Sequence, residues 1–234
     1  MKNAIKALFV MSLMIPSLLF AQSTTNSVYI DQVGAGNNAT ITIKQKGQSN
    51  KIGSEQNRLE LEGNGQTIDI TQEGNSNDIQ GKILDAANIT EDVTITGDTN
   101  TITYDMGDSG SVSGSDRTLV ITGDLNSATF NQGTTASASN ATQTINVTGD
   151  SNTMTSTINA NDVTNTVDIT GNSNTLTTTQ QGHSQHNADI DITGNTNSVT
   201  VSQTGTTNAN TIKVDHTGDS NTINISQCNT GGNC

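Results

Sequence analysis

Apolar and polar residues alternate in short stretches along most of the chain. Each stretch holds two aliphatic residues separated by one polar residue. The clearest pairs are Ile68 and Ile70, Val93 and Ile95, Val167 and Ile169, Ile190 and Ile192, Val199 and Val201, and Ile223 and Ile225. A period of two places both aliphatic side chains on the same face of a β-strand. The pattern therefore predicts many short strands, each with one apolar and one polar face.

A polar spacing recurs together with this alternation: Asn or Gln, five residues, Gln, one residue, Gly, two residues, and Asn or Gln. Its full copies are Asn26, Gln32, Gly34 and Asn37; Gln66, Gln72, Gly74 and Asn77; Asn174, Gln180, Gly182 and Gln185; and Asn197, Gln203, Gly205 and Asn208. Partial copies begin at Asn126, with Gln132, and at Asn221, with Gln227. A spacing that returns in this way is typical of chains that stack structural repeats on one another.

Turns between the strands are marked by Gly, two residues and Asn. These residue types tolerate left-handed backbone angles, and Asn can bond to the nearby main chain. The turns run from Gly97 to Asn100, Gly123 to Asn126, Gly149 to Asn152, Gly171 to Asn174, Gly194 to Asn197 and Gly218 to Asn221, with Gly63 to Gln66 as an earlier variant. Each unit is then two strands and two turns. We expect about eight rungs over residues 22–227, with insertions near 78–92 and 105–117 that loop out.

Parity places polar side chains inside this structure. Asn197 and Gln203 lie an even number of residues from Val199 and Val201, so all four share one face. A single buried amide is costly, whereas stacked identical amides satisfy one another in a ladder. The sequence therefore predicts an all-β, flattened two-sheet β-solenoid with cross-β stacking and interior Asn and Gln ladders.

The first 21 residues predict a secretory signal peptide. Lys2 and Lys6 precede an apolar run over residues 7–20, and Ala21 is a small residue at the expected cleavage point. No second apolar run follows, so we expect no transmembrane segment in the mature chain. Without this segment the chain has no Pro or Trp, which suits a backbone engaged in strand ladders.

The two cysteines occur only at the end of the chain. Cys228 and Cys234 bound a tail over residues 228–234, and export would permit a disulfide between them that closes a small loop. Two cysteines with no nearby His fall short of a zinc site. The net charge of −13 disfavours nucleic acid as a partner. It also suggests that charge restrains association of the strands.

At these residues the chain resembles the curlin family, the secreted subunits of curli functional amyloid. Gln32, Gly34, Asn37 and Ala39 match the family repeat in place, and Gln72, Gly74 and Asn77, like Gln203, Gly205 and Asn208, match its middle part. The opening Ser of the family repeat is Asn or Gln here, and its closing Ala-x-x-x-Gln half is mostly an Ile/Val alternation.

The resemblance implies an extracellular fibre at the cell surface that contributes to biofilm matrix, adhesion and cell aggregation. It implies passage through the periplasm and a dedicated secretion pore, with self-assembly and a related nucleator subunit as partners. Whether this chain is the main subunit, the nucleator or an adhesin stays open.

The same residues disfavour catalysis and calcium binding as functions. An enzyme is disfavoured, because Asp189 and Asp191 alternate with isoleucines and face solvent, and no Ser-His-Asp or zinc spacing occurs. Calcium could bind at turn carboxylates, but the double glycine of calcium-binding β-rolls is absent; these turn residues are Asp98, Asp124, Asp150 and Asp219. We expect no cofactor and no resident metal.

The alternative function is that of a monomeric β-solenoid binding protein, either ice-binding or an adhesin. Flat threonine arrays can match an ice lattice, and Thr-x-Thr occurs at three places, although Thr is also an ordinary strand residue. The pairs are Thr94 and Thr96, Thr101 and Thr103, and Thr175 and Thr177.

Overall fold

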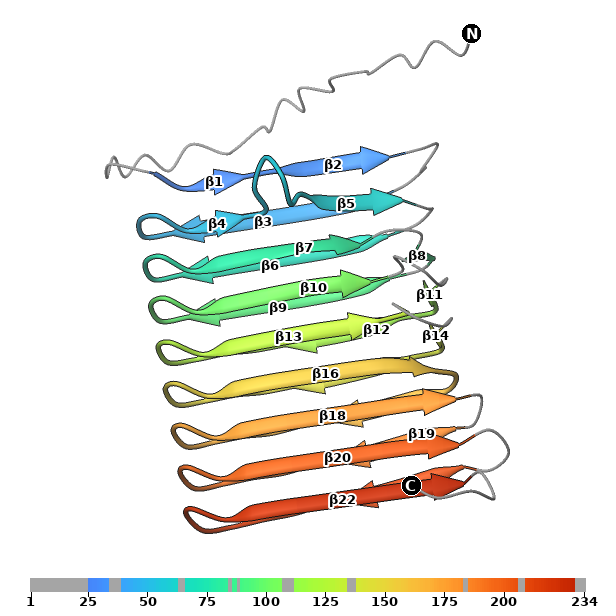
Figure 1. Ribbon diagram of the computed structural model, residues 1–234. Coiled ribbons are helices and arrows are strands. Elements are labelled where there is room, and N and C mark those ends of the chain that lie inside the picture. Colours follow the sequence, from blue (N-terminus) through green and yellow to red (C-terminus); the bar gives the residue numbers. More distant parts are fainter. Residues whose placement is uncertain are drawn as a thin grey trace, which may run out of the picture.

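The computed structural model describes residues 25–33, 39–62, 66–83, 86–87, 89–106, 112–133, 138–182, 185–205 and 209–229. All the regular elements in these ranges are β-strands. They stack into one column that the chain descends from its blue to its red end (Figure 1). The strands form two large sheets and one small sheet.

Sheet 1 is the eleven-stranded sheet and shows its full length in Figure 1. Its strands, from one end of the column to the other, are β1 (Ser27–Val28) with β2 (Ile30–Val33), β4 (Lys51–Ile52) with β5 (Leu59–Glu62), β7 (Asp78–Ile83), β10 (Thr101–Met106), β13 (Ser127–Gln132), β16 (Thr153–Ala160), β18 (Thr175–Gly182), β20 (Ser198–Gly205) and β22 (Thr222–Asn229). β1 and β2 form one level of the column and β4 and β5 the next, so sheet 1 has nine levels.

Sheet 2 is the eight-stranded sheet behind it. Its strands are β3 (Thr40–Lys46), β6 (Thr67–Glu73), β9 (Thr90–Thr96), β12 (Asp116–Leu119), β15 (Thr142–Ile145), β17 (Val163–Thr166), β19 (His186–Asp189) and β21 (Asn210–Lys213). The chain alternates between the two sheets, as a solenoid requires. Sheet 3 contains β8 (Ala86–Ala87), β11 (Val112–Ser113) and β14 (Ala138–Ser139) and lies at one side of the column (Figure 1).

Neighbouring strands are parallel and in register. β18 pairs with β20 from Thr175 opposite Ser198 to Gly182 opposite Gly205, without a shift. Equivalent residues of successive levels therefore lie directly above one another and form columns of side chains. The expected all-β, flattened two-sheet solenoid of about eight rungs is confirmed.

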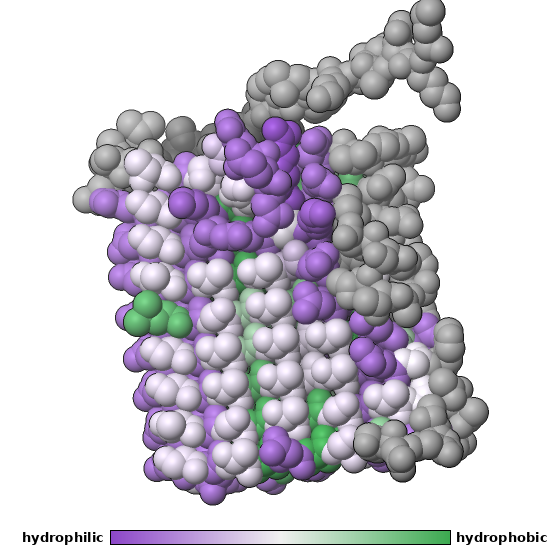
Figure 2. Space-filling model, in the orientation of Figure 1, coloured by the Kyte–Doolittle hydropathy of each residue, from purple (hydrophilic) through white to green (hydrophobic). Residues whose placement is uncertain are grey.

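The aliphatic residues lie between the two sheets. Of the six predicted pairs, the first five are fully buried, and the sixth, Ile223 and Ile225 on the last strand, packs partly buried against the same core. Asn197, Val199, Val201 and Gln203 are all buried on the inner face of sheet 1. The outer face of sheet 1 carries pale columns of weakly polar residues (Figure 2).

The structure places much of the two predicted insertions inside the sheets. Residues 78–83 form β7, residues 90–92 begin β9, and residues 116–117 begin β12. Between them, β8 and β11 stack with β14 in sheet 3, while residues 84, 85, 88 and 107–111 lie outside the described ranges. The excursions are therefore short, because the strands extend further than their weak repeat signal indicated.

One excursion was not predicted. Residues 53–58 leave sheet 1 between β4 and β5 and return through a tight turn, in which Ser54 N–H donates to the carbonyl oxygen of Asn57 at 2.8 Å. The predicted signal peptide, residues 1–21, lies outside the described ranges. Within those ranges, no helix has the length and hydropathy that crossing a membrane would need.

Candidate functional site

Interior amides form a ladder along one side of the column. We call the four residues that lead into a sheet 1 strand, from a Gly to an Asn as in Gly97 to Asn100, the asparagine bend. The ladder contains Asn26, Asn50, Asn77, Asn100, Asn126, Asn152, Asn174, Asn197 and Asn221. It extends from the first level to the last.

Asn174 shows the geometry of this ladder. Its backbone N and its Nδ2 lie 2.9 and 3.1 Å from Oδ1 of Asn152, to which both donate. Its Nδ2 also donates to the carbonyl oxygen of Gly194, at 2.7 Å. Each buried amide thus connects three successive levels and leaves no polar group unpaired, which is what makes its burial tolerable.

A glycine opens each asparagine bend because the next level leaves no room for a side chain. Gly97 has φ of +117°, and a Cβ there would collide with the carbonyl group of Gly123. Two positions later the backbone is again left-handed, at Thr99 with φ of +60°. The four-residue bend therefore has one conformation that repeats at each level.

The residue after this glycine belongs to a second ladder, which the sequence did not reveal. Backbone N–H of Asp98 donates to Oδ1 of Asp124 at 2.7 Å, and Asp124 donates in the same way to Asp150 at 2.8 Å. Asn172 and Asn195 continue this column with the same contacts. The turn carboxylates that suggested calcium thus accept hydrogen bonds from the preceding bend. In the described ranges, no group of three or more His, Cys, Asp or Glu residues could hold a metal ion.

Glutamine ladders are shorter than the asparagine ladder. Gln180 Nε2 donates to Oε1 of Gln203 at 2.8 Å, and Gln203 donates towards Gln227 at 3.4 Å. In sheet 2, Gln45 Nε2 donates to Oε1 of Gln72 at 2.7 Å. In the same sheet 1 column, Ile158 lies between Gln132 and Gln180 and interrupts the glutamines.

The copies of the polar motif occupy two different half-turns. Asn174 and Asn197 precede strands of sheet 1, whereas Gln66 precedes β6 of sheet 2. Thr67 N–H donates to the carbonyl oxygen of Ile89, so Gln66 is level with Ile89 and not with the asparagine ladder. The interpretation of Gly63 to Gln66 as an early asparagine bend is therefore wrong. The motif specifies strand, glycine turn and strand, and either half of a unit can use it.

The remaining predicted residues are placed as follows. Gln32 is in β2 opposite Leu61, Gly182 and Gly205 are opposite each other, Gln185 is exposed, and Gln227 is partly buried. Gly34, Asn37, Asn208 and Cys234 lie outside the described ranges, and Cys228 is in β22, so the disulfide stays a prediction.

A non-repeating cluster fills the middle of the interior. The Arg117 guanidinium lies 5.1 Å from the ring centre of Tyr104 and 4.8 Å from that of Phe130, and its Nη2 donates to Oε1 of Gln132 at 2.8 Å. Burial, and then the nearby Glu91 carboxylate, raise the pKa of Tyr104 well above its ordinary value. The rings of Tyr104 and Phe130 stack on each other. These two residues are 26 positions apart, as are Gly97 and Gly123 of the same two levels, so the interval could have indicated the stacking from the sequence.

In the part of the chain that the structure describes, the column ends in strand edges with no further strand beside them. β1, β2 and β3 form one end, and β21 and β22 form the other, each with a paired neighbour on one side. Aliphatic residues at both ends are only partly buried: Ile30, Ile41, Ile43, Val214, Ile223 and Ile225. Unpaired edges of this kind are templates for another strand.

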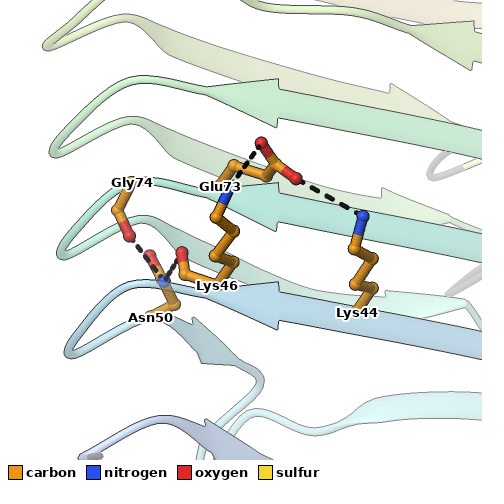
Figure 3. A network of polar contacts seen from close by, with 5 residues as sticks. All are labelled: Lys44, Lys46, Asn50, Glu73 and Gly74. Carbon is orange, nitrogen blue, oxygen red and sulfur yellow. Dashed lines mark hydrogen bonds and ion pairs between the residues drawn. The ribbon is translucent and has the colours of Figure 1, made fainter. Parts of the chain in front are cut away.

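The two ends differ in charge. Residues 25–62 contain four basic and four acidic residues, whereas residues 189–229 contain four acids and one lysine. At the first end, Lys44 and Lys46 both reach Glu73, at 3.4 and 3.6 Å, beside Asn50 (Figure 3). Such exposed ion pairs contribute little to stability. The main effect of these charged side chains is on the electrostatic field at this end of the column.

Comparisons with known proteins gave one family match. Residues 171–205 match the model of the Curlin associated repeat. This segment runs from one asparagine bend through β18, β19 and β20, and so covers one full turn of the solenoid with the strand that follows it. No curated protein and no solved structure matches the chain.

Proposed function

We propose that this chain is the structural subunit of an extracellular curli-like amyloid fibre and that copies assemble end to end. The observation that carries the proposal is the pair of strand edges at the two ends of the column, beside which neighbouring strands are parallel and in register. Within one copy, the asparagine ladder holds successive levels in this register, as when Asn174 accepts two hydrogen bonds on Oδ1 from Asn197. A further copy can continue the strand pairing and the aliphatic core at once.

The function lies in the ladder and the two ends. Outside the cell such a fibre would contribute to biofilm matrix, adhesion and cell aggregation, as the match to the Curlin associated repeat suggests. It would leave the cell through the periplasm and a secretion pore, and a related subunit would nucleate it. These are roles for a structural polymer and need no catalytic group.

Fibre formation by the purified mature chain, residues 22–234, tests the proposal. We expect thioflavin-T-positive fibres with a meridional reflection at about 4.7–4.8 Å. Soluble monomers without this spacing, under conditions of several pH values and salt concentrations, would refute it. Controlled secretion with the predicted leader, followed by labelling of intact cells, tests the location separately.

Net charge should control the rate of assembly. The chain carries −13 at pH 7 and has a sequence pI of about 4.2, so copies repel one another at neutral pH. The thioflavin-T lag time should shorten as the pH falls towards 4.2 or as salt rises. An unchanged lag would show that charge does not limit association.

The alternative is a monomeric, ice-binding solenoid, and one observation favours it. The Thr-x-Thr pairs of sheet 1 lie in register on its outer face, which Figure 2 shows as pale columns. Successive levels carry Thr101 and Thr103, Ser127 and Thr129, Thr153 and Thr155, Thr175 and Thr177, and Ser198 and Thr200. Thermal hysteresis of monomers that form no fibres would favour this function over the fibre.

A further inference from the structure

The described residues form a half-integer number of turns. They begin in sheet 1 with β1 and end in sheet 1 with β22, so in this part of the chain sheet 1 has nine levels and sheet 2 has eight strands. If a second copy stacked in the same orientation, its β1 and β2 would follow β22. Sheet 2 would then lack one strand between β21 and the second copy's β3. Both of these edges would keep unpaired backbone groups inside the fibre, which is costly.

The two sheets are staggered by about half a level. Asn165 Nδ2, from sheet 2, reaches Oγ of Ser156 on β16 at 3.0 Å and Oγ1 of Thr178 on the next strand, β18, at 3.4 Å. Arg117 likewise lies between Tyr104 on β10 and Phe130 on β13. Each strand of sheet 2 thus sits between two levels of sheet 1. A half-turn about the column axis therefore advances the solenoid by about half a level.

We propose that successive copies in the fibre are related by a half-turn about the column axis. The incoming copy places β1 and β2 next to β21, and β3 next to β22. Both sheets then continue without a missing strand. This inference rests on the proposed end-to-end assembly and specifies its geometry.

The side chains of β22 and β3 match in this arrangement. Ile223, Ile225 and Gln227 of one copy meet Ile41, Ile43 and Gln45 of the next, position by position from Thr222 opposite Thr40. The direction of amide donation also agrees. Gln203 donates to Gln227, and Gln45 donates to Gln72, so a bond from Gln227 to Gln45 joins two ladders of the same sense.

The other contact, between β21 and β1 with β2, matches as well. Asn210, Ile212 and Val214 meet Asn26, Val28 and Ile30 of the next copy. Val28 is 43% exposed, unlike its buried counterpart Ile52 one level further in, and the contact would cover it. The edge strand β3 thus presents to β22 the inward pattern of β22 itself, two isoleucines and a glutamine.

Charge favours this head-to-tail contact. The first end, residues 25–62, has no net charge and meets the acidic end at residues 189–229, whereas two acidic ends would repel each other. The contact brings one like-charged pair together, Asp215 and the next copy's Asp31. Arg58 lies 3.3 Å from Asp31 and offsets part of that repulsion.

Site-specific cross-linking within fibres tests the half-turn. In a Cys228→Ser, Cys234→Ser background, Thr40→Cys with Thr222→Cys should give covalent ladders with a short bis-thiol reagent, because strands in contact are about 4.8 Å apart. Ser27→Cys with Thr211→Cys should do the same. Ser27→Cys with Thr222→Cys is the matched control and should give none. Each pair joins opposite ends of the column, so any product is intermolecular.

The outcomes separate the two proposals. Ladders from Ser27→Cys with Thr222→Cys would overturn the half-turn and leave the fibre standing, and fibres without any ladder would also overturn it. If the wild-type chain forms no fibre, the proposed function fails and this inference with it.

Cryo-electron microscopy of wild-type fibres gives a second readout that needs no substitution. We expect a rotation near 180° between subunits and a rise of eight and a half strand spacings, about 41 Å. A rotation near zero with a rise of nine spacings, about 43 Å, would contradict the half-turn.

Discussion

The two bends of the solenoid differ in how strictly they are specified. The asparagine bend has the same four-residue frame at each level, with Gly first and Asn last, and two side-chain ladders run along it. The opposite bend, from a sheet 1 strand to the next sheet 2 strand, has two residues after β16 and nine after β13. One bend therefore fixes the register of the whole column, and the other absorbs the differences between repeats.

A two-residue insertion should show the largest difference in stability between the two bends. Adding Gly-Ser between Asp98 and Thr99 would misplace Asn100 and remove ladder bonds to both adjacent levels. At about 1 kcal/mol for each bond, we expect a loss of about 5 kcal/mol, close to the total stability of many domains. The same insertion between Asn161 and Asp162, in the opposite bend, should cost about 1 kcal/mol or less. Urea unfolding of freshly prepared monomers measures both, and similar losses would contradict the distinction.

Removing one amide tests the ladder without changing the chain length. Asn126→Ala deletes the bonds that Nδ2 donates to Oδ1 of Asn100 and to the carbonyl oxygen of Gly149. It also leaves the backbone N and Nδ2 of Asn152 without their acceptor. Because these groups are buried, we expect a loss of about 3–5 kcal/mol. Gln185→Ala, at an exposed position of the opposite bend, should stay within about 0.5 kcal/mol. A small effect of Asn126→Ala would show that water replaces the ladder bonds.

Backbone strain offers a third comparison of the bends. Gly97→Ala would place a methyl group against the carbonyl group of Gly123 at φ of +117°, so we expect a loss of about 2–3 kcal/mol. Gly114 leads into sheet 2 from the opposite bend with φ of +65°, and the nearest atom to an added Cβ is Oδ1 of Asn140, at 3.1 Å. Gly114→Ala should therefore cost only about 1 kcal/mol. The melting temperatures of the two variants should differ in the same order.

The sequence predicted the regular parts of the molecule well. Period two and parity gave the strands, the inward Asn197 and Gln203, and the turn from Gly194 to Asn197, because these are local and repeat at each level. The sequence also led to an error about Gln66. Both half-turns need the same local chemistry, so local spacing cannot tell one sheet from the other.

The central interior could not be predicted from repeats. Arg117 and Glu91 are charged residues at inward positions, where a repeating pattern would place an aliphatic residue such as Ile68. A side chain at position 81 would collide with the Cβ and backbone of Tyr104 on the next strand, so Gly81 makes room for Tyr104. This relation can be recognised only once the register is known. The second ladder, through Asp98, Asp124 and Asp150, was missed because these side chains are not buried and the parity argument concerned interior side chains.

The smallest expected effect concerns a histidine that follows the opposite bend. His186 is buried at the start of β19, where its Nδ1 lies 3.3 Å from Nδ2 of Asn210 and its Nε2 lies 3.0 Å from the carbonyl oxygen of Gln181. Burial lowers the pKa of His186 below its ordinary value of 6.5. The neutral form is therefore the one that the folded state prefers.

The sign of the pH effect follows from this lowered pKa. The stabilising contribution of neutral His186 is complete above pH 6.5 and is lost as the pH falls through the lower pKa of the folded state. Wild-type monomers should lose stability between about pH 7 and pH 5 more steeply than His186→Asn, which places at this level the residue that Asn210 supplies at the next. Urea unfolding at a series of pH values measures the two slopes. Equal slopes would mean that the folded state accommodates protonated His186. The opposite bend, which already accepts different lengths, would then accept an added positive charge as well.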